Sequence, residues 1–248
     1  MIRFCTAVAV MPLVVLVVAA DSPAADAPVP RPMVTLSAQI SPRRPPIPKG
    51  TPLTLRLNTD FSSVPAGGGF VLTHVDYRFG KGARFNGALF PSCSAAKILR
   101  AHGRLSVCPK GSKVGHGVAT GRAVSVGITS SGKLTIFNGP RGRSIVLNLS
   151  VVVPALINET FEAPIRRLHG GRYALELSSE VPPKLRSILD GDIVVKRLDI
   201  TTGATRLIDG RRRGYIEAGS CPKRGSAVHG DFEFNQGARA SADLTVVC

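Results

Sequence analysis

Hydrophobic and polar residues alternate over short stretches along most of this chain. Leucines alternate with polar residues over 53–57, and residues 71–79 repeat the same period of two. This period is typical of a β-strand with one buried face. In the second stretch the odd positions are expected to face inward, which leaves His74, Asp76 and Arg78 together on the solvent side.

Further stretches of the same kind follow, and glycine-rich breaks separate them at intervals typical of hairpins. Only residues 92–102 and 183–189 have a composition that favours helix. The pattern therefore predicts an all-β fold, an antiparallel β-sandwich whose two sheets curl toward a barrel, with one or two short helices. The further strand-like stretches are 144–153, 172–181, 192–208, 215–218, 227–235 and 238–248.

The first residues have the pattern of a secretory signal peptide. Arg3 precedes an almost wholly apolar stretch, and Val18 and Ala20 occupy the small-residue positions that come before a cleavage site. A retained membrane anchor is the alternative, but the apolar stretch is near the lower length limit for a bilayer and contains Pro12. We therefore expect a secreted or cell-envelope protein with no transmembrane anchor after cleavage.

Composition divides the rest of the chain into a spacer and one domain. Residues 21–32 are rich in alanine and proline, which is typical of a disordered segment. No polar linker interrupts the chain after that, so a single domain is expected. The predicted boundaries are 1–20 for the signal peptide, 21–32 for the spacer and 33–248 for the β-sandwich domain.

The cysteines outside the predicted signal are Cys93, Cys108, Cys221 and Cys248. An even number of cysteines in an exported protein favours disulfides. We expect Cys93–Cys108 to close a loop around the first predicted helix, and Cys221–Cys248 to hold the last strand. Each bridge would stabilise the fold by roughly 3 kcal/mol. The two crossed pairings stay open, because the sequence does not show which halves of the chain meet.

Two segments nearly repeat each other: CPKGSKVGHG at 108–117 and CPKRGSAVHG at 221–230. One interpretation is a structural turn used twice, in which cysteine fixes the chain and glycine and serine lead into a strand. The alternative is a zinc site, which would take as ligands Cys108, His116, Cys221 and His229. The eight-residue spacing and an oxidising compartment favour the disulfide-anchored turn, so no metal or other cofactor is expected.

The charge balance favours anionic partners. Lys and Arg number 32 against 16 Asp and Glu, for a net charge of +16. Such an excess is typical of proteins that associate with anionic cell-wall polymers or glycans, although the charge is spread along the chain and solubility explains it equally well. The chain has no Trp and only 3 Tyr, which argues against the base stacking of specific nucleic-acid binding.

No motif for catalysis stands out. His74 and Asp76 share a strand face, but the Gly-x-Ser-x-Gly turn of a serine hydrolase is absent from the sequence. A pocket that brings His74 or His116 to a carboxylate and a hydroxyl would favour a hydrolase, and a flat basic surface would disfavour it. The acidic pairs Asp190 with Asp192, and Glu159 with Glu162, are better explained by a turn and a strand than by cation binding or glycoside hydrolysis.

The order PSC, a helix, CPKGSKVG, a strand and FNG, from Pro91 to Gly139, resembles a group of uncharacterised secreted β-rich proteins that are abundant in actinobacteria. The resemblance covers most of the chain after the predicted signal and implies export, β-rich architecture and cysteine bridges. It implies no catalytic residues. We therefore expect a secreted, non-enzymatic protein that weakly binds anionic surface polymers. A secreted hydrolase and a subunit of a surface assembly, pairing through a sheet edge, are the alternatives.

Overall fold

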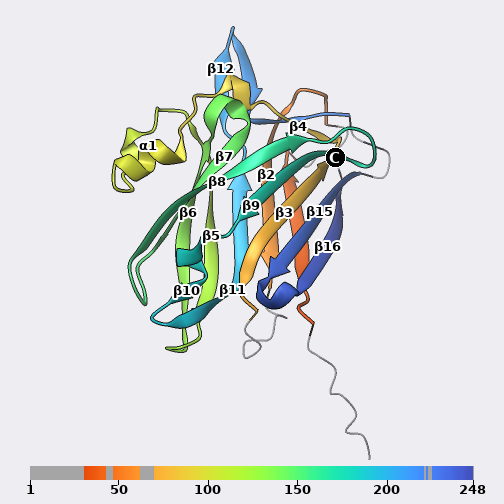
Figure 1. Ribbon diagram of the computed structural model, residues 1–248. Helices are drawn as coiled ribbons and strands as arrows, with labels where there is room; N and C mark the ends of the chain where they lie inside the picture. The colour runs from red at the N-terminus through yellow and green to blue at the C-terminus, as the bar shows by residue number, and fades with distance from the viewer. Residues whose placement is uncertain (1–30, 43–46, 62–69, 221, 223–224, 248) are drawn as a thin grey trace, which may run out of the picture.

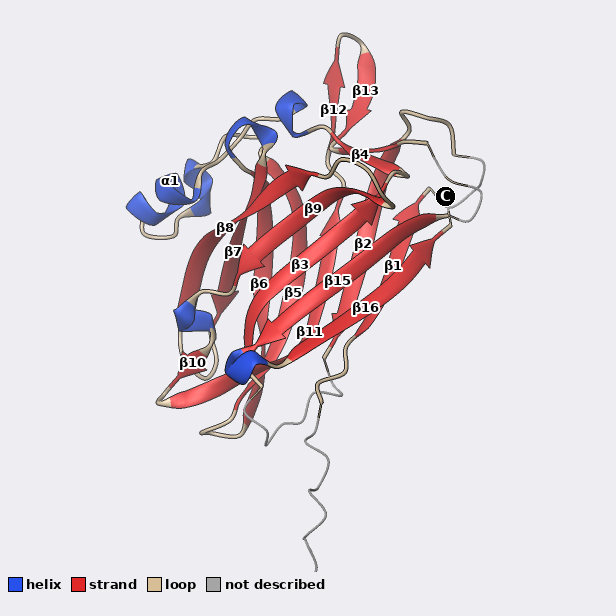
Figure 2. Cartoon of the chain, turned by 45° about the vertical axis from the view of Figure 1, so that its right-hand side comes forward, coloured by secondary structure: helices blue, strands red, loops and turns tan. Residues whose placement is uncertain are grey.

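The computed structural model describes residues 31–42, 47–61, 70–220, 222 and 225–247 (Figure 1). The predicted signal peptide, nearly all of the spacer, Cys221 and Cys248 lie outside these residues. Within them, no helix is long and apolar enough to cross a membrane. The cartoon shows that strands make up most of the described chain, which confirms the all-β prediction (Figure 2).

One antiparallel sheet of 14 strands forms most of the molecule. It bends so that its two halves face each other, and β1 and β16 lie side by side without a shared ladder among the described residues (Figure 2). The predicted sandwich is therefore confirmed, with both layers belonging to one continuous sheet. In order, the main strands are β16 (Arg239–Val246), β15 (Ser226–Phe234), β3 (Leu72–Gly80), β9 (Tyr173–Glu180), β8 (Ile157–Arg167), β7 (Ser144–Val151), β6 (Ile128–Asn138), β5 (Lys113–Ala123), β11 (Gly191–Thr202), β2 (Pro52–Asp60) and β1 (Thr35–Ser41).

Short elements decorate this sheet. The strands β14 (Ile216–Ala218) and β4 (Ala83–Phe85) extend it beyond β2, and β10 (Ser187–Ile188) pairs with β11. A separate hairpin of β12 (Thr205–Ile208) and β13 (Arg211–Gly214) projects from one end (Figure 1). The helical segments are α1 (Ala95–Arg100) and the 3-10 turns η1 (Gly87–Leu89), η2 (Leu105–Val107), η3 (Pro140–Gly142), η4 (Pro183–Leu185) and η5 (Asn235–Gly237).

The two predicted helices differ in outcome. The stretch 92–102 contains α1, where the Ser94 side chain caps the helix by accepting from the backbone N–H of Lys97. The stretch 183–189 forms only the turn η4 and then β10. The carbonyl of Arg186 accepts from the N–H of Ile193, so pairing with β11 replaces helical hydrogen bonds after one turn.

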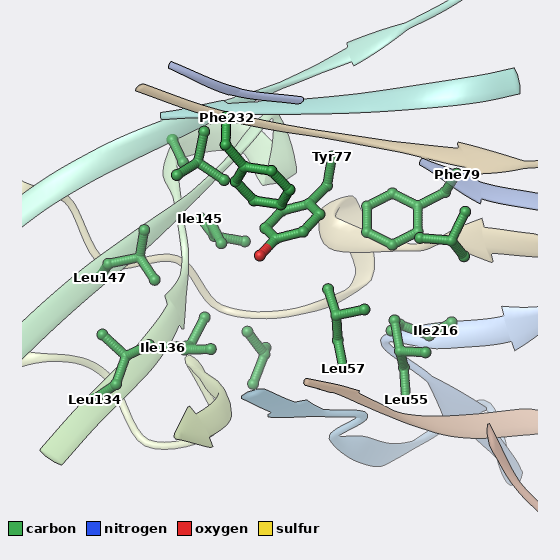
Figure 3. Close-up of a cluster of buried hydrophobic side chains, with 14 of the residues drawn as sticks. Leu55, Leu57, Tyr77, Phe79, Leu134, Ile136, Ile145, Leu147, Ile216 and Phe232 are labelled. Carbon is green, nitrogen blue, oxygen red and sulfur yellow. The ribbon is translucent and has the colours of Figure 1, made fainter. Parts of the chain in front are cut away.

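The core lies between the two halves of the sheet (Figure 3). Strand β3 shows why, because Val75, Tyr77 and Phe79 are buried while the residues between them face outward, as the period of two predicts. The period is broken at the start of the strand, where a register shift against β15 buries Leu72 in place of Thr73. The Tyr77 hydroxyl is 2.6 Å from Oγ1 of Thr59 across the core, and burial raises the pKa of Tyr77. Its ring also meets Phe232 edge-on, with centroids 5.8 Å apart.

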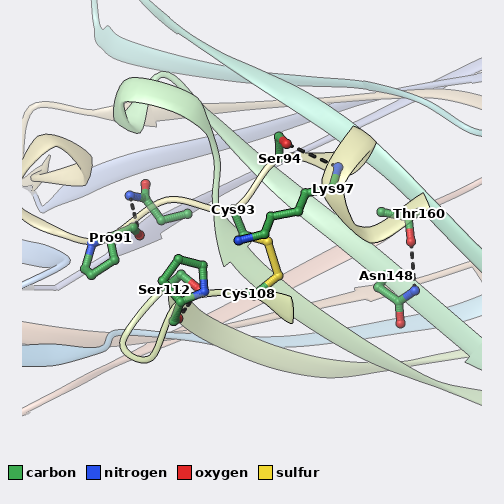
Figure 4. The surroundings of a disulfide bond; sticks show 10 residues. Pro91, Cys93, Ser94, Lys97, Cys108, Ser112, Asn148 and Thr160 are labelled. Carbon is green, nitrogen blue, oxygen red and sulfur yellow. Dashed lines mark hydrogen bonds between the residues drawn. A yellow bond between two sulfur atoms is a disulfide. The ribbon is translucent and has the colours of Figure 1, made fainter. Parts of the chain in front are cut away.

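A smaller cluster lies outside the sheet around the disulfide Cys93–Cys108, whose expected pairing is confirmed (Figure 4). The loop that this bridge closes contains α1, and Ile98 of that helix is fully buried. The side-chain amide of buried Asn138 donates to the backbone carbonyls of Gly87, Phe90 and Pro91. These contacts hold the 87–108 segment against the end of β6.

Candidate ligand cavity

An apolar cavity lies inside the sandwich and has a volume of about 180 Å³. Its wall contains no charged side chain, and its polar groups are limited to hydroxyls and backbone. It reaches the surface beside the β7–β8 loop, where Val153 belongs to the wall and is 55% exposed. We refer to this end of the cavity as the mouth.

The strand register explains why the wall is apolar. Leu147 on β7 pairs with Phe161 on β8, and Leu134 on β6 pairs with Leu149 on β7. All four face the cavity, because residues directly opposite in an antiparallel pair share a face of the sheet. On β5 the inward positions are small, as with Ala119, and small side chains on one layer leave room that the other layer does not occupy.

Two smaller voids continue from this cavity along the core. One of about 50 Å³ shares Tyr77, Ile145 and Leu177 with the main cavity. The next, of about 40 Å³, shares Leu55 and Phe79 with the second. The unfilled space is therefore elongated along the sandwich rather than round.

Part of the cavity wall has no strand ladder. Strands β8 and β9 pair only between Ile165–Arg167 and Leu175–Leu177, and they separate toward the mouth. The segment 182–188, which contains η4 and β10, covers this gap with Leu185 and Ile188 facing the cavity. We call this segment the strap.

The strap is held by polar contacts on its outer side. Lys184 Nζ lies 3.8 Å from Oε2 of Glu159 on β8. Arg186 donates from Nε to the Val181 carbonyl at 2.6 Å, and its Nη2 is 3.4 Å from Oε2 of Glu180. Exposed ion pairs of this kind contribute little to stability, so the strap depends mainly on buried Leu185.

Outside the sheet, His74 on β3 lies close to a hydroxyl and two carboxylates. Its Nε2 is 3.0 Å from Oδ1 of Asp76 and 3.1 Å from Oγ of Ser178, and its Nδ1 is 3.0 Å from Oε1 of Glu180. The sequence pattern placed only His74 and Asp76 together, and strand β9 supplies the other two. A hydroxyl, an imidazole and a carboxylate in this order resemble a hydrolase triad.

The electrostatics of this cluster do not suit nucleophilic catalysis. Desolvation lowers the pKa of His74, but hydrogen bonds and negative charge from Asp76 and Glu180 outweigh it, so the pKa is raised. The two carboxylates favour the cationic form of the imidazole, and its Nε2 faces Asp76 as well as Ser178, so the arrangement disfavours a role as base for Ser178. The cluster also faces away from the cavity, since buried Val75 and Tyr77 mark the other face of β3.

A second histidine on the same outer face repeats this arrangement. His229 on β15 lies with Nε2 3.0 Å from Oδ1 of Asp231 and Nδ1 3.0 Å from Oδ1 of Asp243. Desolvation raises the pKa of Asp243, but hydrogen bonds from His229 and the Tyr173 hydroxyl lower it by more, so the pKa is lowered overall. Arg78 on β3 pairs with Asp231 at 2.9 Å and with Glu176 on β9 at 3.5 Å. The face is a network of paired charges.

In their described parts, the two near-repeated segments share one kind of backbone hydrogen bond. The N–H of Ser112 bonds to the carbonyl of Pro109, and the N–H of Gly225 bonds to that of Pro222. A strand begins directly after each turn, β5 in one case and β15 in the other. In both segments a hydrogen bond with the same three-residue spacing therefore comes just before a strand.

The described members of the alternative zinc set, Cys108, His116 and His229, do not form a metal site. Cys108 is bonded to Cys93 and offers no thiolate, and Cys221 lies outside the described residues. His116 is exposed on β5, while His229 lies on β15, and the two strands are not neighbours. No group of three or more potential metal ligands occurs among the described residues.

The acidic pairs have other roles. Asp190 lies in the β10–β11 turn with a φ of 56°, which accords with the turn interpretation. Glu159 faces the strap from β8, while Glu162 accepts a hydrogen bond from the hydroxyl of Ser144. The two glutamates differ in position by three residues on one strand, and therefore do not face each other across a cleft.

The cavity itself was not predicted from the sequence. Its one signal is the small residues at alternate positions Ala119, Gly121 and Ala123, on a strand that faces larger aliphatic side chains. Searches against protein-family models and against curated proteins find no match for this chain.

Proposed function

We propose that this protein binds a ligand with a hydrocarbon chain, of the fatty-acyl class, inside the sandwich and without altering it chemically. The observation that carries the proposal is the cavity of about 180 Å³ whose wall has no charged side chain. An engineered apolar cavity of about 150 Å³ stays free of water and binds benzene. The cavity here is slightly larger and continues into two further voids.

The shape of the unfilled space favours a chain over a compact ring system. A chain can enter at the mouth and extend along the row of voids, while its polar end stays in water beside the strap. Each methylene group that leaves water contributes about 0.8 kcal/mol, which is about a fourfold gain in affinity. Affinity should therefore rise with chain length and then level off when the space is full.

A titration with saturated fatty acids of increasing length tests this proposal directly. Displacement of a fluorescent fatty acid gives the dissociation constants, and we expect the rise and plateau just described. The variant Ala119→Leu adds bulk to the cavity wall and should weaken binding at least tenfold. Ala163→Leu, on the opposite wall, serves as an independent second variant.

The matched control is Val118→Leu, because Val118 is the neighbouring residue on β5 and is exposed. It should bind like the wild type. Thermal unfolding of all variants separates a filled cavity from a damaged fold, since overpacking costs about 1–3 kcal/mol. Equal affinity for all chain lengths, or equal binding by Ala119→Leu and Val118→Leu, contradicts the proposal.

Weak binding to anionic surface polymers is a second candidate, favoured by the β12–β13 hairpin. Arg206, Arg211 and Arg212 are exposed there, against one acidic residue, Asp209. Retention on purified cell-wall polymer should fall steeply with salt, because exposed charges are screened beyond about 8 Å at physiological ionic strength. The disulfide supports a location outside the cytosol for either function.

A further inference from the structure

Among the described residues, most of the large apolar side chains that are exposed lie at the mouth end of the molecule. They lie in or directly beside three turns that join β5 to β6, β7 to β8 and β10 to β11 (Figure 1). The most exposed is Leu156, at 78%. We call this set the rim: Val124, Val126, Ile128, Val152, Val153, Leu156 and Leu189.

The three turns form one surface around the mouth. The N–H of Val124 bonds to the carbonyl of Asp192, which joins the β5–β6 turn to the start of β11. A side chain at Gly191 would lie 2.4 Å from Ser125, so these two turns are in close contact. The β7–β8 loop reaches the same cavity through Val153 and Pro154.

One rim residue is held in a backbone conformation that leucine rarely adopts. Leu189 has a φ of 49° and is 55% exposed. The left-handed region costs a non-glycine residue about 1 kcal/mol or more, and exposure of leucine adds nothing to folding. Neither the positive φ nor the exposure of Leu189 stabilises the folded chain. We therefore expect its role to lie in contact with another molecule.

Charge at this end is balanced by local pairs. Lys184 faces Glu159, and Arg186 faces Glu180, as described for the strap. The other charged residues in and beside these turns are Arg122, which is exposed near the end of β5, and Asp190 and Asp192 in and after the β10–β11 turn. A partner attracted mainly by charge therefore finds little net charge here, whereas an apolar partner can contact all the side chains of the rim.

We propose that the rim inserts into the surface of a lipid layer, so that a chain passes between the layer and the cavity without crossing water. This inference rests on the proposed function. Lipid is favoured because the rim surrounds the opening through which a hydrocarbon chain must pass. A fluid lipid layer also accommodates three separate projecting turns without a complementary shape.

Flotation with phosphatidylcholine vesicles tests the insertion. The protein is used as the expressing cell processes it, and residues 1–30 are the same in every variant, so any binding by that segment is common to all. We expect the wild type to float with the vesicles at both low and high salt. Leu156→Asp and Val126→Asp should each weaken this association roughly tenfold, since a leucine or valine then no longer enters the apolar layer.

The matched control is Leu207→Asp, because Leu207 is 71% exposed on the β12–β13 hairpin at the other end. It should float like the wild type. Equal flotation of Leu156→Asp and the wild type overturns the proposal. Flotation only with anionic lipid and only at low salt also overturns it, and assigns the membrane contact to the arginines of the hairpin.

Two further measurements separate this inference from the proposed function. Octanoate is soluble without vesicles, and its binding to Leu156→Asp should equal that of the wild type, since Leu156 is not part of the cavity wall. Ala119→Leu should lose octanoate but keep vesicle flotation. A dimer that light scattering detects in the wild type and not in Leu156→Asp would assign the rim to a second copy of the chain and overturn the lipid assignment.

Discussion

The two ends of this sandwich differ in where their polar and apolar side chains lie. At the end that carries the β12–β13 hairpin, polar side chains are buried and hydrogen-bonded, as with the carboxylate of Glu217 and the amide nitrogen of Asn138, although Oδ1 of Asn138 and the hydroxyl of Tyr215 have no partner among the described residues. At the mouth end, apolar groups are exposed and the space behind them is unfilled. A buried polar group with partners fixes one geometry, whereas an unfilled apolar space tolerates change. The comparison indicates that the hairpin end specifies the fold and the mouth end serves a ligand.

Removal of Glu217 should have the largest effect on stability. Its side chain is fully buried, and its carboxylate accepts from Arg213 at 2.8 Å, from Arg84 at 2.9 Å and from the N–H of Gly214 at 3.1 Å. Loss of one member of a buried ion pair costs about 3–5 kcal/mol. Because both arginines stay partly exposed, Glu217→Leu should lower the free energy of unfolding by about 3 kcal/mol. Chemical denaturation measures the change.

Glu233→Gln is the control for that variant, because Glu233 pairs with Arg239 at 2.8 Å but is 44% exposed. It should cost less than about 1 kcal/mol. If the two substitutions have similar effects, the contrast between buried and exposed charge at the two ends is wrong.

Removal of the disulfide should have the next largest effect on stability. Cys93 and Cys108 are 15 residues apart, and a loop of about that length predicts roughly 3 kcal/mol of stabilisation through restriction of the unfolded chain. The double variant Cys93→Ala/Cys108→Ala should lower the unfolding temperature but leave fatty-acid binding intact, since neither residue belongs to the cavity wall. A loss of binding at a temperature where this variant remains folded would show that the two ends are coupled.

Acid should weaken the hairpin end through Glu217. Desolvation raises the pKa of Glu217, but Arg213, Gly214 and Arg84 outweigh it and lower the pKa to about 2. Because the folded pKa lies below the usual value near 4.5, this stabilisation is present above about pH 4.5 and is lost as the pH falls toward 2. Unfolding curves of the wild type and Glu217→Gln should therefore converge as the pH falls through this range. Parallel curves would contradict the assignment.

The stability that His74 contributes on the outer face of β3 should change with pH in the opposite direction. The folded pKa of His74 lies above its usual 6.5, so its contribution is complete below pH 6.5 and is lost as the pH rises through the folded pKa. His74→Gln should remove this dependence, and titration by NMR reports the pKa directly. A pKa below 6.5 would restore His74 as a possible base for Ser178.

Much of the fold was predictable from local pattern, and the cavity was not. The period of two fixes which side of β3 is buried, and the loop between Cys93 and Cys108 is short enough to indicate their pairing. The FNG segment also has a structural explanation, since a Cβ on Gly139 would lie 2.0 Å from Oγ of Ser144. These features depend on neighbours in sequence or on one strand partner.

The cavity depends instead on how two layers face each other across the core. Ala119 on β5 and Leu177 on β9 both line the cavity, although their strands are not neighbours in the sheet, and their separation is set by the bend of the whole sheet. The same holds for His74, whose partners Ser178 and Glu180 arrive from β9. A sequence pattern shows which face a residue occupies but not which distant residue it meets.

The smallest expected effect gives the sharpest test of the comparison. Leu189→Gly relieves a left-handed leucine and should raise stability by up to about 1 kcal/mol, because glycine adopts positive φ without strain. Asp209→Gly is the matched change at the other end, with a φ of 47° in the hairpin turn, and should gain less because aspartate tolerates this region better. Thermal unfolding measures both gains. Only Leu189→Gly should weaken vesicle flotation, since it alone removes a rim side chain. A more stable protein that docks less well would show that leucine is retained there at the expense of folding, whereas equal flotation of the two variants would leave its exposure without a function.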